Sequence, residues 1–215
     1  MRSFKQIMTS SIVKKQVMGV TGLLLCGFLI THLAGNCLIY LGPDVFNTYA
    51  HTLITNPLLY PAEAILALLF LSHIALAARL TIENNKARPV KYYMKSPTGR
   101  GSTFASSTMP YTGIITLVFL VLHLLNFKYG TMYTTQVGGV EMRDIYKTVI
   151  DHFRSPLNIL WYIFAVLSLG IHVSHGFWSA FQSLGFNHPK YNCTLKCVSK
   201  LYALLITVGY SALPI

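Results

Sequence analysis

Five long apolar stretches dominate this 215-residue chain. A membrane-spanning helix needs about 20 mostly apolar residues to cross the hydrocarbon core of a bilayer. Stretches of this kind cover residues 17–41, 58–80, 111–127, 157–184 and 198–213, and the last is the shortest. Because 53% of the residues are hydrophobic and 11% are charged, the composition argues against a soluble enzyme. We predict an all-α integral membrane bundle of five transmembrane helices, forming a single domain over residues 1–215 and surrounded by lipid.

The positions of proline and glycine residues agree with these helix boundaries. Proline is tolerated at the start of a helix and glycine is common just after its end. We therefore expect prolines at or just before the starts of spans, and glycines at their ends: Pro57, Pro61, Pro110 and Pro156, and Gly42, Gly130 and Gly185. No small-residue cleavage site follows the first apolar stretch, so the basic, amphipathic segment 1–16 is predicted to be a retained helix.

The chain is strongly basic, with 17 Lys and Arg against six Asp and Glu. The cations lie between apolar stretches and are not interleaved with aromatic residues on a polar face, so we expect no nucleic-acid partner. The N-terminal segment and the second and fourth connections hold most of them. The first and third connections hold four: Lys128, Arg143, Lys147 and Arg154. The positive-inside rule then predicts a cytoplasmic N-terminus and an external C-terminus.

The third connection contains a mixed-charge stretch, residues 141–153, that we expect to form a helix along the outer membrane surface. The four cysteines form no Cys-x-x-Cys and no Cys-x-x-Cys-His pattern. This excludes covalent c-type haem and most zinc or iron–sulfur sites. Six carboxylates are also too few for a carboxylate-rich catalytic or calcium site.

An internal repeat relates the first and third apolar stretches. Met, Thr, Gly, Phe, His and Leu recur at one offset, as Met18-Gly-Val-Thr-Gly22, Phe28 and His32-Leu33, and then as Met109-Pro-Tyr-Thr-Gly113, Phe119 and His123-Leu124. The second and fourth stretches match more weakly, because His73 follows Pro57 at the same distance as His172 follows Pro156. This pseudo-symmetry indicates a four-helix unit with a fifth helix added.

Each of the first four stretches thus carries a histidine where an ionisable group is costly. Any one of them could be a hydrogen-bonded packing residue, but four at matched positions favour a shared role. Neutral imidazole is the usual axial ligand of b-type haem, held between facing helices. Depth along antiparallel helices predicts two layers: an outer haem iron between His32 and His123, and an inner one between His73 and His172.

His175 leaves an alternative open, because it lies three residues beyond His172 on the same helix face. The spacing from Pro156 favours His172 as the ligand. His175 would then contact a haem propionate, serve as the alternative ligand, or be a core residue. We expect His152 and His188 to be surface loop residues.

The sequence resembles the diheme cytochrome b membrane subunit of succinate dehydrogenases and fumarate reductases, in the form with one large anchor polypeptide. The resemblance covers nearly the whole chain. It rests on Ser10–Gly22 with Phe28 and His32–Asn36, on Gly42–Tyr49, and on His172-Val-Ser-His-Gly176-Phe-Trp178 followed by Gly185. In that fourth-helix motif the first histidine is the ligand, which agrees with His172.

The resemblance implies a multi-pass subunit of the bacterial cytoplasmic (inner) membrane that has no catalytic head of its own. It would carry two haem b and pass electrons between an iron–sulfur subunit and a quinone, with menaquinone expected, beside a flavoprotein containing FAD. Both partners would dock on the cytoplasmic face. The quinone would bind near the outer haem, where the candidate polar residues are Asn36, Asp44, His51 and Glu63. Some members have a glutamate two residues before the fourth-helix ligand, where this chain has Gly170.

Two other functions compete with this interpretation. One is the cytochrome b subunit of another quinone-linked complex, such as a formate dehydrogenase or a hydrogenase. Those anchors usually have four spans and a different histidine spacing. The other is a proton-coupled membrane transporter, in which the histidines would relay protons.

Overall fold

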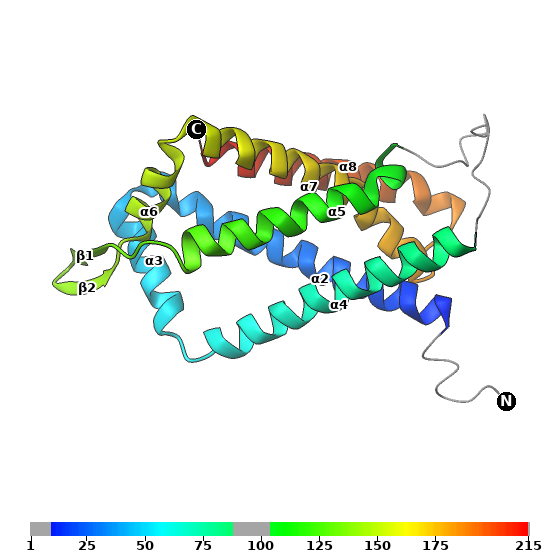
Figure 1. Ribbon diagram of the computed structural model, residues 1–215, viewed down its shortest axis with the longest axis horizontal. Coiled ribbons are helices and arrows are strands. Elements are labelled where there is room, and N and C mark those ends of the chain that lie inside the picture. Colours follow the sequence, from blue (N-terminus) through cyan, green and yellow to red (C-terminus); the bar gives the residue numbers. More distant parts are fainter. Residues whose placement is uncertain (1–9, 88–103, 215) are drawn as a thin grey trace.

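Five long helices dominate the computed structural model, which describes residues 10–87 and 104–214 (Figure 1). Each is long and apolar enough to cross a membrane. They are α2 (Ser11–Cys37), continued by the 3₁₀ turn η1 (Leu38–Leu41); α4 (Leu59–Lys86); α5 (Phe104–His123), continued by the π-helical turn η2 (Leu124–Lys128); α7 (Pro156–Ser183); and α8 (Pro189–Ala212). The expected all-α architecture with five membrane helices is confirmed, and the chain is a multi-pass membrane protein.

Three helices begin several residues earlier than their apolar stretches: α2 at Ser11, α5 and α8. α8 starts at Pro189, because proline suits the first helical turn and the His188 side chain accepts a hydrogen bond from the Lys190 N–H. α5 starts at Phe104, so the expectation that Pro110 marks the start of a span is wrong: this proline lies inside the helix. Hydropathy detects only the apolar part of a helix, and these three helices have polar residues in their first turns.

The connections after α2 and α5 gather at one end of the bundle, together with the C-terminus (Figure 1). They form α3 (Pro43–Thr55), the antiparallel hairpin of β1 (Thr134–Val137) and β2 (Val140–Arg143), and α6 (Ile145–Phe153). The prediction of a helix over 141–153 is therefore wrong for its first residues. Gly138 and Gly139 both have positive φ and close a two-residue hairpin turn, which places the residues after them in a strand. Asp144 caps α6 by accepting from the Lys147 N–H.

The N-terminal prediction can be followed only in part, because residues 1–9 lie outside the described residues. Ser10 caps α2 by accepting from the Val13 N–H. The basic residues Lys14 and Lys15 thus lie in the first turns of the first membrane helix.

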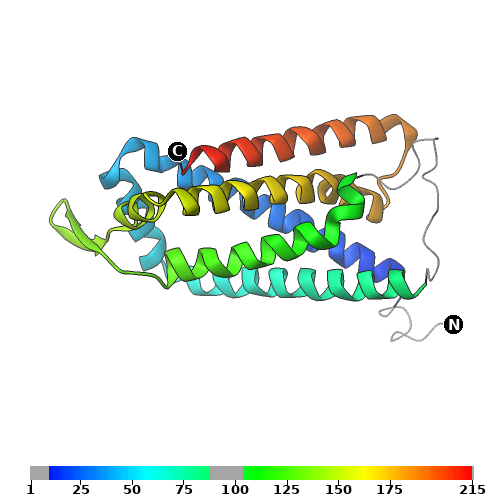
Figure 2. The ribbon, with the colours of Figure 1, turned by 45° about the horizontal axis from the view of Figure 1, so that its top comes forward.

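Four of the helices surround a common interior, and α8 packs on the outside of α2 and α7 (Figure 2). α2 packs against α4 and α7, and α5 packs against α7 and touches α4. α2 and α5 are therefore diagonally opposite, as are α4 and α7. A side chain that points inward from one of these helices therefore meets the side chains of the diagonally opposite helix across the interior.

The buried apolar core lies between α2, α7 and α8. Its members are Cys26, Leu33, Leu169, Val173, Tyr202, Ala203 and Ile206. Two tyrosine hydroxyls on α8 donate to backbone carbonyls of α2: Tyr202 to Cys26 and Tyr210 to Leu29, both at 2.8 Å. By contrast, α4 and α5 each have one buried residue in the described part of the chain: Leu80 in α4 and Thr112 in α5. The core thus fixes three helices, while α4 and α5 add little buried surface of their own.

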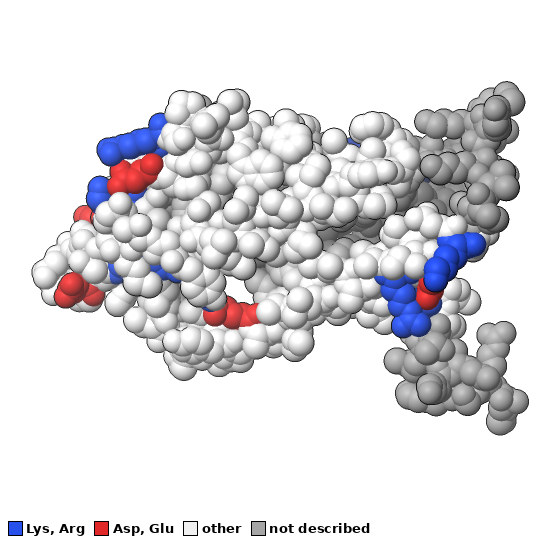
Figure 3. All heavy atoms as spheres, in the orientation of Figure 1, with Lys and Arg blue, Asp and Glu red and all other residues white. Residues whose placement is uncertain are grey.

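Charged side chains are concentrated at the two ends, with an uncharged band between them on the face that Figure 3 shows. The end where α2 starts carries, among the described residues, one acid, Glu83, and many cations: Lys14, Lys15, Arg79, Lys86, Lys190, Lys196 and Lys200. The opposite end has balanced charge, with Lys128, Arg143, Lys147 and Arg154 against Asp44, Glu63, Glu141, Asp144 and Asp151. The other cations of the second connection fall in residues 88–103, outside the described part.

The contact between α7 and α8 gives a test of this packing. A Cβ added at Gly170 would collide with the hydroxyl of Thr207, so Gly170→Ala should destabilise the protein by about 1–3 kcal/mol. Thr207→Ala removes the hydroxyl, and the double variant should recover most of the loss. Gly27→Ala is the control, because a Cβ there would contact nothing within 4 Å. Thermal unfolding midpoints in detergent would measure all four proteins. Equal midpoints for Gly170→Ala and Gly27→Ala would contradict this packing.

Candidate functional site

The four intramembrane histidines meet in two pairs across the diagonals of the bundle. His32 from α2 and His123 from α5 have ring centroids 5.9 Å apart. His73 from α4 and His172 from α7 have ring centroids 6.5 Å apart. The partners in each pair are the ones that depth along the helices predicted.

The two pairs lie at different depths. Thr21 of α2 contacts His73, and it lies eleven residues before His32 on the same helix. At 1.5 Å per residue, the two layers are about 16 Å apart along the helix axis. The spacing on α5 is the same, since Thr112 contacts His172 eleven residues before His123. The His32–His123 layer is nearer the end with the hairpin, and we call it the outer pair; the His73–His172 layer is the inner pair.

A threonine of a neighbouring helix holds each imidazole of the inner pair. The hydroxyl of Thr21 is 3.2 Å from Nδ1 of His73, and the hydroxyl of Thr112 is 3.2 Å from Nδ1 of His172. The following glycines also approach these rings. An added Cβ would stand 3.3 Å from Cε1 of His73 at Gly22, and 3.5 Å from Cε1 of His172 at Gly113.

The outer pair has a different environment. His32 stacks on Phe28 of its own helix, and Asn36 places its amide nitrogen 3.4 Å from Nε2. On the other side of the interior, the Tyr162 hydroxyl is 3.5 Å from Nδ1 of His123, and Phe119 and Phe127 contact the same ring. Aromatic side chains thus surround the outer pair, where hydroxyls hold the inner one.

His175 lies one turn beyond His172 and is partly buried. Among the described residues, the imidazole that His73 faces is that of His172. The geometry therefore supports His172 over His175 as the partner of His73.

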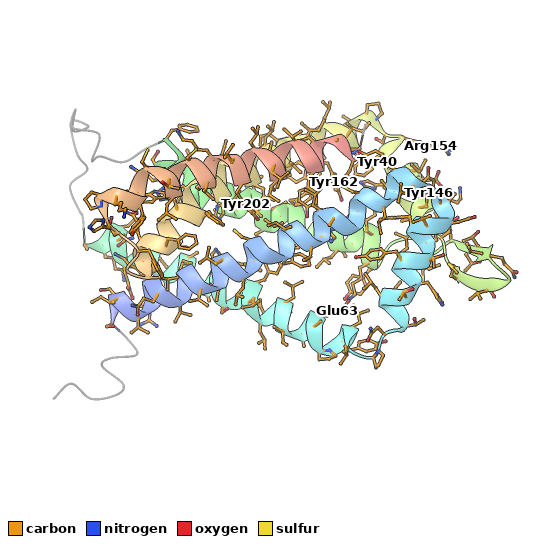
Figure 4. All side chains as sticks on the ribbon, turned by 180° about the vertical axis from the view of Figure 1, so that it is seen from behind. Tyr40, Glu63, Tyr146, Arg154, Tyr162 and Tyr202 are labelled. Carbon is orange, nitrogen blue, oxygen red and sulfur yellow. The ribbon has the colours of Figure 1, made fainter. Side chains whose placement is uncertain are left out.

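The four quinone-site candidates all lie at the outer end but do not converge. Asn36 touches His32, while Glu63 forms an ion pair with Lys128 between α4 and η2. Figure 4 shows Glu63 on α4, in the part of the helix that follows α3. Asp44 lies on α3 and lines a shallow depression there, and His51 is farther along the same helix.

A polar pocket near the outer pair was missed by the sequence analysis. It lies open between η2, the connection that precedes β1, and α6, and its lining residues are Leu125, Asn126, Gly130, Thr131, Tyr133, Thr148, Asp151 and His152. The ring of His152 lies 4.9 Å from that of Phe127 and 5.3 Å from that of Tyr162, the two aromatic residues that contact His123. The expectation that His152 is a surface loop residue is therefore wrong. The sequence did contain a signal for this contact. The residues of α6 form an amphipathic pattern, which indicates that one face of the helix packs against the bundle.

Burial and charge set the protonation of this pocket. Burial lowers the pKa of His152 below its ordinary value of 6.5, and its Nε2 is buried without a hydrogen-bond partner among the described residues. The hydrogen bond from Lys147 holds the pKa of Asp151 below its ordinary range. At neutral pH the pocket thus holds a neutral imidazole beside a charged, paired carboxylate.

The histidine pairs fit a metal ion whose other ligands come from a prosthetic group and not from the protein. Among residues 10–87 and 104–214, no three His, Cys, Asp or Glu side chains come together as a metal site. Two imidazoles bound to opposite sides of one metal, at about 2 Å per bond, have their ring centroids ~6 Å apart. Both pairs are close to that spacing. Haem iron takes one or two protein ligands and its other ligands from the macrocycle, so two facing imidazoles fit this group.

Comparison with known proteins gives one informative match. The chain is 30% identical over 155 residues to the succinate dehydrogenase cytochrome b558 subunit of Bacillus subtilis (strain 168), covering 71% of this chain and 69% of that protein. No family model matches, and no solved structure gives a significant match.

The neutral state of His152 predicts a pH-dependent opening of α6. The folded protein binds this proton less well than the unfolded chain, so acidification stabilises the opened form. As the pH falls from about 6.5 toward the lowered pKa, hydrogen exchange of residues 145–153, corrected for intrinsic rates, should increase. His152→Gln should remove most of this increase. Asp151 stays charged in this range, so an equal increase in both proteins would contradict the assignment.

Proposed function

Since the chain belongs to the succinate dehydrogenase cytochrome b subunit family, we propose that it anchors a succinate dehydrogenase or fumarate reductase complex and passes electrons between its iron–sulfur subunit and a membrane quinone. The observation that carries the proposal is the pair of imidazole layers, each built across a diagonal of the bundle at its own depth. A bundle that needed histidines only for packing would have no reason to repeat this arrangement.

Each imidazole pair binds one haem b in this proposal, His32 with His123 and His73 with His172. The haem supplies an iron that gains or loses one electron without a change of protein ligand. The chain supplies the neutral imidazoles, fixes their orientation and keeps them in an apolar interior. Two layers about 16 Å apart along the axis give an electron two intermediate positions between the two ends of the bundle.

The unequal charge of the two ends supports the proposed orientation. The end with a single described acid, Glu83, and seven described cations faces the cytoplasm under the positive-inside rule. The N-terminus is then cytoplasmic and the C-terminus external. The flavoprotein with FAD and the iron–sulfur subunit dock on this basic end, beside the inner pair. These assignments are part of the proposal and agree with a bacterial cytoplasmic membrane.

The quinone, which we propose to be menaquinone, reacts at the outer end. Quinone reduction consumes two protons with two electrons, so its site needs polar groups near the outer pair and within reach of water. Asn36 beside His32 and the Glu63–Lys128 ion pair meet the first need. The pocket of His152 and Asp151 adds a neutral imidazole that can accept or release a proton. Asp44 lines a separate depression on α3 and His51 lies on the same helix, so we keep both as peripheral candidates.

Haem quantification tests the central proposal. The complex, purified in detergent, should show a reduced-minus-oxidised spectrum of b-type haem, with about two haems per chain. Replacing His32 or His123 with alanine should remove the outer haem, and replacing His73 or His172 should remove the inner one. His175→Ala is the matched control on the same helix and should retain both. A well-folded preparation without haem would refute the proposal and favour a proton-coupled transporter.

Quinone turnover tests the outer end separately. Glu63→Gln and His152→Gln should lower succinate-dependent quinone reduction, by about 100-fold where the proton transfer is rate-limiting. Electron transfer from succinate to a water-soluble dye that bypasses this chain should stay unchanged, and so should the haem content. Glu141→Gln, on the exposed hairpin strand, is the control. Full quinone activity in both variants would place the quinone elsewhere.

A further inference from the structure

The repeat Met-x-x-Thr-Gly has a structural counterpart that explains why it occurs twice. We call Met18–Gly22 on α2 and Met109–Gly113 on α5 the Thr-Gly motifs. Each contacts the inner-pair histidine of the helix packed beside it: Thr21 and Gly22 contact His73, and Thr112 and Gly113 contact His172. Both threonines are buried.

The hydrogen bonds of the threonines define the protonation of the rings. The Thr21 hydroxyl donates to the carbonyls of Val17 and Met18, at 2.9 and 3.1 Å. Both carbonyls are nearer to this oxygen than Nδ1 of His73 is, so the arrangement favours a hydroxyl that donates to the backbone and accepts from His73. In that arrangement Nδ1 of His73 carries the hydrogen, and the backbone of Met18 is a second hydrogen-bond partner of this ring. A neutral imidazole has one N–H, so Nε2 is left with a free lone pair.

The second motif repeats the same logic. The Thr112 hydroxyl donates to the carbonyls of Thr108 and Met109, at 3.1 and 3.2 Å, and its oxygen is 3.2 Å from Nδ1 of His172, in position to accept from it. The glycine that follows each threonine lets the ring lie against the helix backbone, because a Cβ there would press on Cε1. One side of each imidazole is thus held by the neighbouring helix, and Nε2 stays available.

We propose that Thr21 and Thr112 are positioning residues that fix His73 and His172 in the Nδ1–H tautomer, with Nε2 as the metal-binding atom of the inner haem. This inference rests on the proposed haem-binding function and goes beyond it. Each of α2 and α5 then serves both layers: it carries one outer ligand itself and orients one inner ligand of its neighbour. The outer pair is held less closely: the amide nitrogen of Asn36, a donor, is 3.4 Å from Nε2 of His32, and the Tyr162 hydroxyl is 3.5 Å from Nδ1 of His123.

The variants Thr21→Val and Thr112→Val remove the hydroxyl acceptor while nearly conserving shape, and they leave the backbones of Met18 and Met109 as the remaining hydrogen-bond partners of the two rings. Thr21→Ser and Thr112→Ser restore the hydroxyl. Hydrogen bonding from Nδ1–H makes a ligating imidazole more basic and stabilises the oxidised iron. In the intact complex, the valine variants should therefore raise the midpoint potential of the inner haem and shift its ferric electron paramagnetic resonance signal. The signal and potential of the outer haem should not move, and the serine variants should resemble the parent protein.

Matched controls lie on the same helices. Thr31→Val on α2 and Thr116→Val on α5 remove hydroxyls that donate to their own backbone, to Phe28 and Thr112. They should leave both haems unchanged. Gly22→Ala should disturb the inner haem, whereas Gly27→Ala should not. If the valine variants keep the inner potential and signal of the parent, or shift both haems equally, the proposal is overturned.

A direct observation of the tautomer keeps this test independent of the haem assignment. Solid-state NMR of the reduced protein with ¹⁵N-labelled histidine should show the hydrogen on Nδ1 of His73 and His172, and His→Gln variants would assign the two signals. If the purified protein held no haem, the proposed function would fail, yet the same spectrum would still report the tautomer. Hydrogen on Nε2 of these residues would overturn the positioning role in either case.

Discussion

A polar ring inside a hydrocarbon-embedded bundle must find its partners within the bundle, and the arrangement of this molecule follows from that constraint. The four imidazoles meet across the diagonals, where two helices can present side chains to each other without their backbones in contact. The threonine hydroxyls satisfy the inner rings. Because α4 and α5 use their inward faces for these residues, they contribute little to the apolar core.

The fifth helix compensates for that weakness. Apolar side chains have little driving force to associate in lipid, so membrane helices depend on close packing and hydrogen bonds between helices. α8 supplies both: its tyrosines donate to carbonyls of α2, and Thr207 fills the space that Gly170 leaves on α7. The side chain of Thr207 occupies the place where a longer residue at position 170 would point. A glutamate there would need this part of the bundle to repack.

The sequence predicts the features that depend on period and distance along one helix. The spans, the partners within each histidine pair and their order in depth follow from hydropathy and from 1.5 Å per residue. It fails where a contact joins distant segments. Nothing near Glu63 in sequence points to Lys128, and nothing near His152 points to Phe127. It also fails where polar residues continue a membrane helix, as at the start of α8, because capping and not hydropathy sets that boundary.

The two layers differ in what they allow a proton to do. In the tautomer that we propose, each inner imidazole donates its hydrogen to a hydroxyl that donates to the backbone, so neither group has a proton to exchange. The outer pair lies beside a pocket that holds the neutral His152 and the charged Asp151, close to an end with exposed connections. An electron can reach either layer, but an electron with a proton requires the second environment. Under the proposed function, this asymmetry suits the inner layer to electron transfer alone and the outer layer to proton-coupled quinone chemistry.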